Sequence, residues 1–441
     1  RERMPAVSYL LNVAYLALLA AAWPWLAYKA ARQGKYREGF GAKFFGAVPR
    51  RQGDRPCVWL HAVSVGEVNL LATLLTEIGK RRPGWECVIS TTTMTGYALA
   101  KKKYAGYAVF YCPLDFSWAV RRAMRSIRPS CLVLAELELW PNLIRAAREQ
   151  GARVAVVNGR LSQHSHRGYR RIRPLVARLL RQVDLIAAQN KEYAERFLDL
   201  GASPAAVQIT GSMKFDGAQT DRRNAATRRL SELAGISDSD IVFLAGSTQE
   251  PEEELTIATL RELSAEHPRL RFVLVPRHRE RFEEVARLLD SSGMPWQRRS
   301  RLEADGANSR ARILLVDAIG ELGAWWGAAH IAFVGGSLGS RGGQNMIEPA
   351  AYGAAVSFGP NTRNFRDIVA QLLAAEAGVV VNDGAELTAF VRRALVDRPF
   401  AEALGQRARD LVASQLGATA RTFELLAPLV DQPQAARRLA A

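Results

Sequence analysis

The hydrophobic positions along the chain fall into short runs that alternate regularly with longer amphipathic segments. Short runs rich in Val, Ile and Leu between helical stretches are typical of parallel strands covered by helices on both faces. The pattern therefore predicts an α/β fold with two doubly wound, Rossmann-like domains facing a cleft. The predicted strands are Cys57–Val63, Glu86–Thr91, Ala108–Pro113, Cys131–Glu136, Arg153–Gly159 and Leu185–Gln189, then Ile241–Gly246, Arg271–Pro276, Ile313–Asp317, Ile331–Gly336, Ala355–Gly359 and Val379–Asn382.

The N-terminal region has a different pattern. Val7–Tyr28 contains no charged residue, and as a helix it would reach about 33 Å, enough to cross a hydrocarbon core. Trp23 and Trp25 lie near its C-terminal end, and seven basic residues against one acid follow between Lys29 and Arg51. By the positive-inside rule, the rest of the chain lies on the cytoplasmic side. We favour a membrane-anchor helix that spans or inserts deeply, with a cleaved signal peptide and an internal apolar helix as the alternatives.

The two series of strands are separated by a polar, arginine-rich stretch, Asp216–Arg229. We therefore expect an anchor over residues 1–30, an N-terminal domain over 31–215 and a C-terminal domain over 216–441. With 48% hydrophobic and 23% charged residues, the composition is that of a folded protein and excludes a disordered chain. The four cysteines form no CxxC pair, which indicates free core thiols and argues against disulfides or a zinc site.

In the N-terminal half, acidic residues follow two of the predicted strands. Ligands bind at the carboxyl ends of the strands in such sheets, so these positions are candidates for chemistry. Glu67 lies at a strand-to-helix turn, where it could accept a proton from a substrate hydroxyl or simply stabilise the first turn of the helix. Glu136 ends an apolar strand, and Glu138 would face the same side of an extended chain. Paired carboxylates raise one pKa unless a cation lies close.

In the C-terminal half, glycines gather in two stretches, Gly335–Ser337 and Gly342–Glu348. Such turns let backbone amides approach a phosphate, although glycines also serve tight turns alone. Arg277 and Lys214 are candidate cations for phosphate. The chain has no GxxxxGK[ST] loop and no GxGxxG that opens a helix, so an ordinary ATPase or dinucleotide enzyme is not indicated. These features predict a nucleotide-sugar site in the C-terminal domain and an acceptor site in the N-terminal one.

These residues belong to five blocks, which are Val63–Glu67, Glu136–Leu143, Gly211–Asp216, Pro276–His278 and Gly342–Glu348. In this order the blocks resemble those of the 3-deoxy-D-manno-octulosonic acid (Kdo) transferases of lipopolysaccharide synthesis. The likeness covers nearly the whole chain, and the run Glu-Leu-Trp-Pro-Asn-Leu, which begins at Glu138, is its most specific part.

The resemblance implies a GT-B glycosyltransferase fold at the cytoplasmic face of the inner membrane. It implies transfer of Kdo from the donor CMP-Kdo to the lipid A precursor lipid IVA without a metal or other cofactor. By the same resemblance, Glu67 is the general base, and Glu136 and Lys214 stabilise the transition state. The segments implied to contact CMP are Pro276 and Arg277, then Ile319, Gly320 and Glu321, then Asn345, Met346, Ile347 and Glu348.

The chain departs from the family pattern at three places. Gln249 and Gln344 stand where the family usually has histidine, and Trp325-Trp326 stands where a Leu-Tyr pair is more typical. Glutamine donates and accepts hydrogen bonds but carries no charge near pH 7. A role for those family histidines in protonation therefore does not carry over to this chain.

The overall charge is strongly positive, with 60 Lys and Arg against 43 Asp and Glu. Between Arg160 and Arg181 there are seven arginines and no acid, which suggests a surface for the anionic lipids of the inner membrane. The sequence has no RNA-binding signature or zinc-finger spacing, so no nucleic-acid partner is expected. The remaining alternatives are another membrane-associated GT-B enzyme with a different nucleotide sugar and lipid acceptor, and a catalytically silent glycolipid-binding protein.

Overall fold

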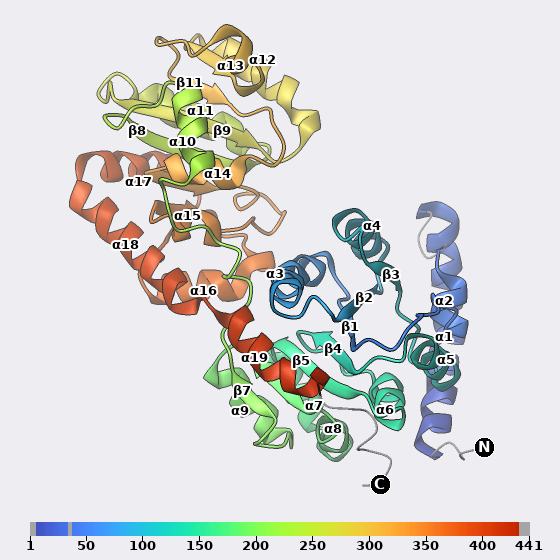
Figure 1. Ribbon diagram of the computed structural model, residues 1–441. Helices are drawn as coiled ribbons and strands as arrows, with labels where there is room; N and C mark the ends of the chain where they lie inside the picture. The colour runs from blue at the N-terminus through green and yellow to red at the C-terminus, as the bar shows by residue number, and fades with distance from the viewer. Residues whose placement is uncertain (1–5, 34–37, 432–441) are drawn as a thin grey trace. The chain divides into compact units, whose positions relative to one another are not determined.

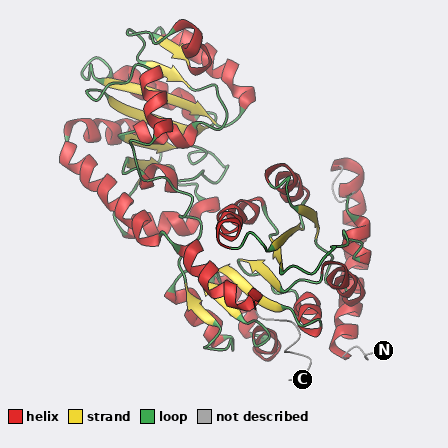
Figure 2. Cartoon of the chain, viewed as in Figure 1, coloured by secondary structure: helices red, strands yellow, loops and turns green. Residues whose placement is uncertain are grey.

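The computed structural model describes residues 6–33 and 38–431 of the chain. The chain folds as two compact units (Figures 1 and 2). Unit 1 extends through Gly217 and includes the C-terminal segment from Leu416 on, and unit 2 is Ala218–Gln415.

Unit 1 is built on a parallel sheet of seven strands in the order β3-β2-β1-β4-β5-β6-β7. Its strands are β1 (Cys57–His61), β2 (Glu86–Thr91), β3 (Ala108–Tyr111), β4 (Cys131–Ala135), β5 (Arg153–Gly159), β6 (Leu185–Ala188) and β7 (Val207–Ile209). Its helices are α1 (Ala6–Gln33), α2 (Phe40–Phe45), α3 (Val65–Arg81), α4 (Met94–Lys103), α5 (Ser117–Ile127), α6 (Pro141–Glu149), α7 (Gln163–Arg170), α8 (Arg173–Leu180), α9 (Lys191–Asp199) and α19 (Ala418–Asp431).

Both faces of this sheet are buried, as the predicted parallel arrangement requires. Successive side chains of a strand point to opposite faces, so Leu60 and Val133 join one core cluster and Trp59 and Leu132 join another. Every residue of β1 and β4 is buried, which is why these strands appear in the sequence as continuous apolar runs.

The C-terminal helix α19 belongs to unit 1, whereas the sequence assigned all of residues 216–441 to the second domain. Its apolar residues Phe423, Leu426 and Val430 are buried in the core cluster that contains Leu60. Figure 1 shows α19 (red) beside α3 and β5, which it contacts. The boundary itself, after Gly217, lies two residues from the expected one. Periodicity alone gives α19 an apolar face but does not say which sheet that face covers.

Unit 2 has a second parallel sheet of seven strands in the order β10-β11-β9-β8-β12-β13-β14. Its strands are β8 (Ile241–Thr248), β9 (Leu270–Pro276), β10 (Trp296–Arg298), β11 (Ile313–Leu315), β12 (Ile331–Val334), β13 (Ala355–Phe358) and β14 (Val379–Val380). Its α-helices are α10 (Ala225–Leu233), α11 (Glu252–Leu263), α12 (Phe282–Ser292), α13 (Leu302–Asp305), α14 (Leu322–Ala328), α15 (Ile347–Ala351), α16 (Arg366–Ala374), α17 (Gly384–Val396) and α18 (Arg398–Gln415).

All twelve predicted strands are present, so the predicted pair of doubly wound domains is confirmed. The sequence missed only β7 and β10 among the described residues. Each has three residues and is an edge strand of its sheet, where few side chains are fully buried. Without an apolar run, such a strand has no clear sequence signal.

Candidate active site

Glu67 lies in the first turn of α3, directly after β1. Ser64 caps this helix, because its hydroxyl oxygen accepts a hydrogen bond from the Glu67 amide at 3.3 Å. The Glu67 carboxylate reaches back in return: Oε2 accepts from the Val63 amide at 2.8 Å, and Oε1 accepts from the Ser64 hydroxyl at 2.7 Å. The expected stabilisation of a helix start by Glu67 is therefore confirmed, and the same bonds fix the carboxylate at the carboxyl edge of the sheet.

The environment of Glu67 shifts its titration. Burial raises the pKa of the Glu67 carboxyl group, and the negative charge of Glu136 raises it further. The bonds from Ser64 and Val63 act in the opposite direction, but burial dominates, and the pKa stays above its ordinary value. A carboxylate with a raised pKa is a stronger proton acceptor once it is ionised.

Glu136 follows β4 and has a left-handed backbone conformation, with φ = 56°. Few residues other than glycine adopt this conformation, and held strain of this kind is concentrated at functional sites. The conformation is locked by a hydrogen bond from the Glu136 amide to the Val157 carbonyl at 2.9 Å. The side chain forms an ion pair with Lys214, whose Nζ lies 2.8 Å from Oε1. The structure thus brings together two residues that are 78 positions apart.

Lys214 lies on a loop after β7 that two polar residues hold in place. The side-chain oxygen of Asn158 accepts a hydrogen bond from the Met213 amide at 3.0 Å. The carboxylate of Asp216 accepts bonds from the Gly417 amide, at 2.6 Å, and from the Thr419 amide. The loop is therefore fastened to β5 on one side and to the start of α19 on the other. Sequence reasoning missed Asn158, because its role depends on a neighbouring strand and no local motif marks it.

Glu138 adds a third carboxyl group at this edge of the sheet. Its Oε2 accepts a hydrogen bond from the Trp140 indole at 2.9 Å. Burial, followed by the negative charge of Glu67, raises the pKa of Glu138 to about 7. We call Glu67, Glu136 and Glu138 the acidic cluster. With Lys214 beside it, the cluster combines groups that can accept a proton with one ammonium group.

In unit 2, the predicted donor-site residues follow the carboxyl ends of β9, β11 and β12. Pro276 is the last, buried residue of β9, and the exposed Arg277 comes next. Its amide donates to the Thr248 carbonyl at 3.0 Å, which fixes the direction of the chain as it leaves the strand. The Arg277 side chain extends from the position where such sheets bind ligands.

The residues Asn345–Glu348 lead into α15. The Asn345 side chain donates to Glu348 Oε1 at 3.0 Å and accepts from the Ile347 amide at 3.1 Å, so it holds the start of this helix. Burial raises the pKa of the Glu348 carboxyl group, while Asn345 and the positive charge of Arg277 lower it in part. The side chains of Met346 and Ile347 are buried and anchor the turn. Glu348 and Arg277 therefore lie near enough for their charges to interact.

Ile319, Gly320 and Glu321 lie on the loop between β11 and α14. Gly320 has φ = 94°, which a residue with a side chain rarely adopts, and Ile319 is 75% exposed. Glu321 receives two hydrogen bonds from the Arg299 guanidinium, at 2.7 and 2.8 Å, and one from the Trp325 indole at 3.2 Å. The buried Arg299, which sequence reasoning also missed, thus braces the loop through a bidentate pair.

The glycine-rich turn after β12 differs from the expectation. The amides of the turn Gly335–Ser337 were expected to approach a phosphate, but those of Gly336 and Ser337, together with the Leu338 amide, donate to the carboxylate of Glu252 at 2.7 to 2.9 Å. Glu252 is 1% exposed and also accepts from the Gln249 amide. The prediction that this turn cradles a phosphate is therefore wrong, because an internal carboxylate already occupies its amides.

The two glutamines at the family's usual histidine positions lie together. A Cβ atom on Gly336 would lie 3.2 Å from Nε2 of both Gln249 and Gln344. The two carboxamides therefore flank the same glycine at the carboxyl edge of the second sheet. Neither can replace a charged imidazole near pH 7.

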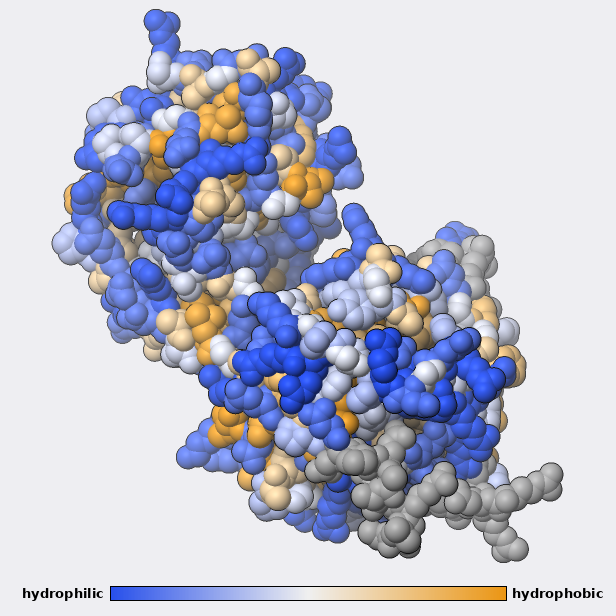
Figure 3. All heavy atoms as spheres, viewed as in Figure 1, coloured by the Kyte–Doolittle hydropathy of each residue, from blue (hydrophilic) through white to orange (hydrophobic). Residues whose placement is uncertain are grey.

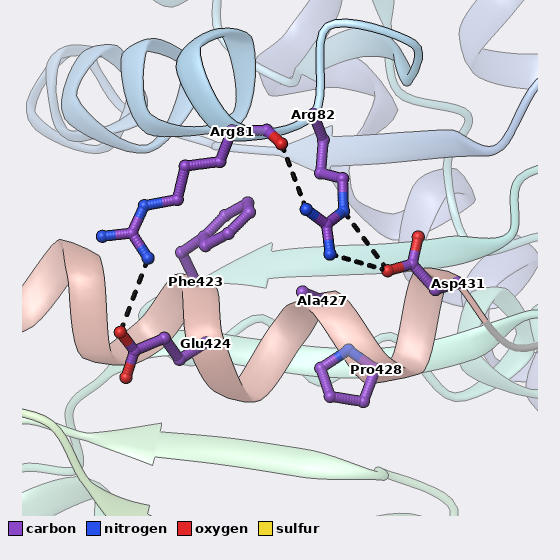
Figure 4. Close-up of a pocket in the computed structure, with 7 residues that line it drawn as sticks. All are labelled: Arg81, Arg82, Phe423, Glu424, Ala427, Pro428 and Asp431. Atoms are coloured by element: carbon purple, nitrogen blue, oxygen red, sulfur yellow. Dashed lines mark hydrogen bonds and ion pairs between the residues drawn. The ribbon is translucent and has the colours of Figure 1, made fainter.

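One surface groove of unit 1 lies away from these residues. Arg81, Arg82, Phe423 and Asp431 line it between the end of α3 and α19 (Figure 4). It is next to the start of β2, and hence at the opposite edge of the sheet from Glu67. Its charges are paired within the protein, Arg81 with Glu424 and Arg82 with Asp431. These ion pairs hold α19 in place, and the groove is not a candidate for catalysis.

The chain is similar in sequence to proteins of one known family. A family described as 3-deoxy-D-manno-octulosonic-acid transferase (kdotransferase) matches residues 36–217. The chain is 34% identical over 417 residues to the 3-deoxy-D-manno-octulosonic acid transferase of Bordetella pertussis, covering 92% of this chain and 95% of that protein. It is 32% identical over 406 residues to that of Haemophilus influenzae, covering 90% and 93%.

A solved structure supports the fold class. The UDP-GlcNAc 2-epimerase from Neisseria meningitidis bound to UDP-GlcNAc superposes with a TM-score of 0.57 at 13% identity, covering 84% of this chain and all of that chain. This likeness confirms the expected GT-B architecture and says nothing further. With two relatives above 30% identity over nine tenths of its length, the chain belongs to the 3-deoxy-D-manno-octulosonic acid transferases.

Proposed function

We propose that the protein transfers Kdo from CMP-Kdo to a hydroxyl group of lipid IVA, with Glu67 as the general base. The observation that carries this proposal is the acidic cluster beside Lys214, at the carboxyl edge of the first sheet. Glu67 is nearly buried, its carboxylate is held by two hydrogen bonds, and its pKa is raised. These are the properties of a base that is oriented for a single proton transfer.

The proposed step is a substitution at the anomeric carbon of Kdo. The acceptor hydroxyl gives its proton to Glu67, and its oxygen forms the new bond to the anomeric carbon. The bond from that carbon to the phosphate oxygen breaks, and its electron pair leaves with CMP. Positive charge develops at the anomeric carbon during this exchange, so a fixed anion such as Glu136 would stabilise it.

The donor is proposed to bind unit 2. Arg277 supplies a forked donor for the phosphate, and the loop Ile319–Glu321 and the segment Asn345–Glu348 would contact the nucleotide. Glu348 has one carboxylate oxygen bonded to Asn345, and such a group can accept bonds from ribose hydroxyls. Lys214, in unit 1, would balance the negative charge that accumulates as CMP departs.

The proposed site needs no metal, because its own cations can balance the phosphate charge. Among residues 6–33 and 38–431, no group of three or more His, Cys, Asp or Glu side chains is arranged to hold a metal ion. We expect 5 mM EDTA to leave the transfer rate within about twofold of the untreated rate. Removal of a metal that the reaction required would lower the rate far more. A loss above tenfold that Mg²⁺ restores would contradict metal independence.

The protein is proposed to act at the cytoplasmic side of the inner membrane. Among the described residues, one helix, with its window at Ser8–Trp25, is long and apolar enough to cross a membrane. The anionic lipids of that membrane are the proposed partners of the basic segment Arg160–Arg181. Part of this segment also packs internally, since Arg170 and Arg173 contact Asp199.

The decisive experiment is mass spectrometry of lipid IVA after incubation with the purified protein and CMP-Kdo generated in place. We expect a mass increase of one or more Kdo units, and the spectrum counts them. A protein that binds CMP, as measured by thermal shift, but never modifies lipid IVA would refute this acceptor. Product with a different nucleotide sugar under the same conditions would refute the donor.

A further inference from the structure

The N-terminal helix α1 has its polar and apolar faces reversed relative to a helix of a soluble domain. Its less exposed positions form one stripe, and the two that are fully buried are polar. The stripe consists of Ser8, Leu11, Asn12, Tyr15, Leu19 and Ala22. The exposed positions are mostly large and apolar: Tyr9, Leu10, Val13, Leu16, Leu18, Trp23, Trp25 and Tyr28. In contrast, hydrophilic side chains cover most of the face shown in Figure 3.

The polar residues of this stripe form hydrogen bonds with the rest of unit 1. Helix α5 has no side-chain cap of its own, and Asn12 supplies one. The Asn12 side-chain oxygen accepts from the Ser117 amide at 3.0 Å, and its nitrogen donates to the Ser117 hydroxyl at 2.8 Å. One turn further on, the Tyr15 hydroxyl donates to Asp115 at 3.0 Å. Figure 1 shows α1 running alongside α5, in agreement with these contacts.

Asp115 connects this stripe to the helix that follows the acidic cluster. Helix α6 also lacks a cap of its own, and the Asp115 carboxylate accepts from the amides of Asn142 and Leu143 at 3.0 and 2.8 Å. The Arg145 guanidinium of the same helix donates to the Ser8 hydroxyl at 2.8 Å. Asn12 of α1 therefore caps α5 directly. The N-terminus of α6 is held by Asp115, to which Tyr15 of α1 also bonds.

These contacts are incompatible with a helix that crosses a bilayer. The less exposed stripe, which bonds to unit 1 at Ser8, Asn12 and Tyr15, continues to Ala22 and covers about 21 Å of the helix axis. Only Trp23–Gln33 follows it, and these residues would reach about 16 Å, roughly half of the hydrocarbon core. If the docked part crossed, Asp115 and Arg145 would enter the hydrocarbon with it, at a large cost in free energy.

The exposed apolar face continues beyond α1. The Tyr15 ring packs against Phe116, with ring centres 6.1 Å apart, and Phe116 packs in turn on Phe44 of α2. Next to these rings, Phe40, Phe45 and Trp118 expose much of their side chains. Two exposed arginines adjoin this surface: Arg32 lies over the Tyr28 ring, and Arg122 donates to the Phe45 carbonyl. An apolar surface with a basic border fits the interface of an anionic bilayer.

We propose that α1 lies in the plane of the membrane, within one leaflet, and does not cross the bilayer. Its Ser8–Asn12–Tyr15 stripe faces unit 1, and its outer face, together with the exposed rings of α2 and α5, is in lipid. The occupant of this surface is the cytoplasmic leaflet of an anionic bilayer. The inference rests on the membrane association proposed above and specifies its geometry, with α1 bonded directly to the helices next to the acidic cluster.

Label depth in the membrane tests this geometry. Leu10, Ala17 and Tyr28 lie on one line along α1, opposite the docked stripe, so single cysteines there can each carry a nitroxide. The four native cysteines are buried, which directs the label to the introduced site. The full-length protein is bound to vesicles of phosphatidylglycerol and phosphatidylethanolamine, and depth is measured from the accessibility of each label to oxygen and to a water-soluble nickel chelate.

In-plane binding predicts that all three labels lie at the same depth, within about 5 Å, because the helix axis is parallel to the surface. A crossing helix would separate residues 10 and 28 by about 27 Å and give a shallow, deep, shallow series. That series would overturn the proposal, and so would three labels exposed to water. Kdo transfer to lipid IVA in detergent, measured on the same variants, tests the proposed function independently of the depths.

A second measurement tests the docking itself. In Asn12→Leu, the Ser117 amide loses its bond to Asn12, so hydrogen exchange at the start of α5 is expected to rise about tenfold, the equivalent of one hydrogen bond. Val13→Leu changes the exposed neighbour and should leave this exchange unchanged. Equal exchange in both variants would show that α1 is not docked on α5.

Discussion

The carboxyl edges of the two sheets differ in how their carboxylates are neutralised. In unit 1, burial raises the pKa of Glu67 and Glu138, and Glu136 pairs with the ammonium group of Lys214. In unit 2, Glu252 and Glu321 have internal partners of their own. Glu252 accepts four backbone amides, and Glu321 accepts the forked guanidinium of Arg299.

This difference separates two kinds of chemistry. A carboxyl group whose pKa is raised by burial can take up a proton, which is the task proposed for unit 1. Where internal donors satisfy the carboxylates, an exposed cation such as Arg277 stays available for an anionic ligand, which is the task proposed for unit 2. The predictions below test that division, beginning with the largest expected effect.

Glu67→Gln should abolish most of the transfer activity. The amide can keep the acceptor role toward Val63 but cannot take up the proton, so kcat should fall by about 10² to 10⁴. CMP binding, measured by calorimetry, should stay unchanged. Glu77→Gln, at a half-buried position of the same helix where the side chain pairs with Arg81, is the matched control. Substantial residual turnover in Glu67→Gln would refute its role as the base.

Arg277→Gln should act on donor binding and leave proton transfer alone. Losing a charged hydrogen-bond partner costs about 1.5–3 kcal/mol, so the Kd for CMP should rise by about 10- to 100-fold. The acidic limb of the pH–rate profile should not move. The exposed Arg279, two residues on, provides the control variant Arg279→Gln. If the acidic limb shifted and CMP bound normally, the division between the two units would be wrong.

Lys214→Met should damage the acidic cluster by removing its cation. Without that charge, the pKa of Glu67 should rise further, so the acidic limb of kcat/KM should move to higher pH. We expect a loss of about tenfold at neutral pH, equivalent to about 1.4 kcal/mol. Lys191→Met, which removes an exposed lysine of α9, should change neither quantity. A uniform loss at every pH would indicate a structural role for Lys214.

Glu138→Gln should have the smallest effect, on stability. Because the pKa of Glu138 is raised to about 7 in the folded protein, ionisation destabilises the fold as pH rises from the unfolded value of about 4.3 through 7. The variant avoids this loss and should be more stable than the parent at pH 8, by about 1 kcal/mol after allowance for solvent screening. Thermal unfolding at pH 5 and pH 8 measures it, and a gap that grows toward pH 5 would contradict the sign. Glu195→Gln on the surface of α9 is the control.

Much of the fold was predictable because its strands are buried on both faces. The apolar runs of β1 and β4 identified the parallel sheets, and the residues after each strand identified Glu67 and Arg277 as candidates for a site. The family that the five blocks indicated is confirmed by relatives that cover nine tenths of the chain. The sequence did not show which distant residues form hydrogen bonds with one another. The glycine-rich turn was expected to hold a phosphate, but Glu252 is buried against it, and no local pattern shows that contact.

The element order, the two parallel sheets and the family could be predicted from the sequence, because periodicity and short motifs are properties of neighbouring residues. Which side chains meet depends on the three-dimensional packing. The Glu136–Lys214 pair, the loop held by Asn158 and the docking of Asn12 on α5 each join residues more than 50 positions apart. The apolar run of α1 was evident in the sequence, but its membrane orientation depends on the two or three polar side chains that bond to unit 1. An apolar run is a property of consecutive residues, whereas each of these bonds depends on how two distant segments pack together.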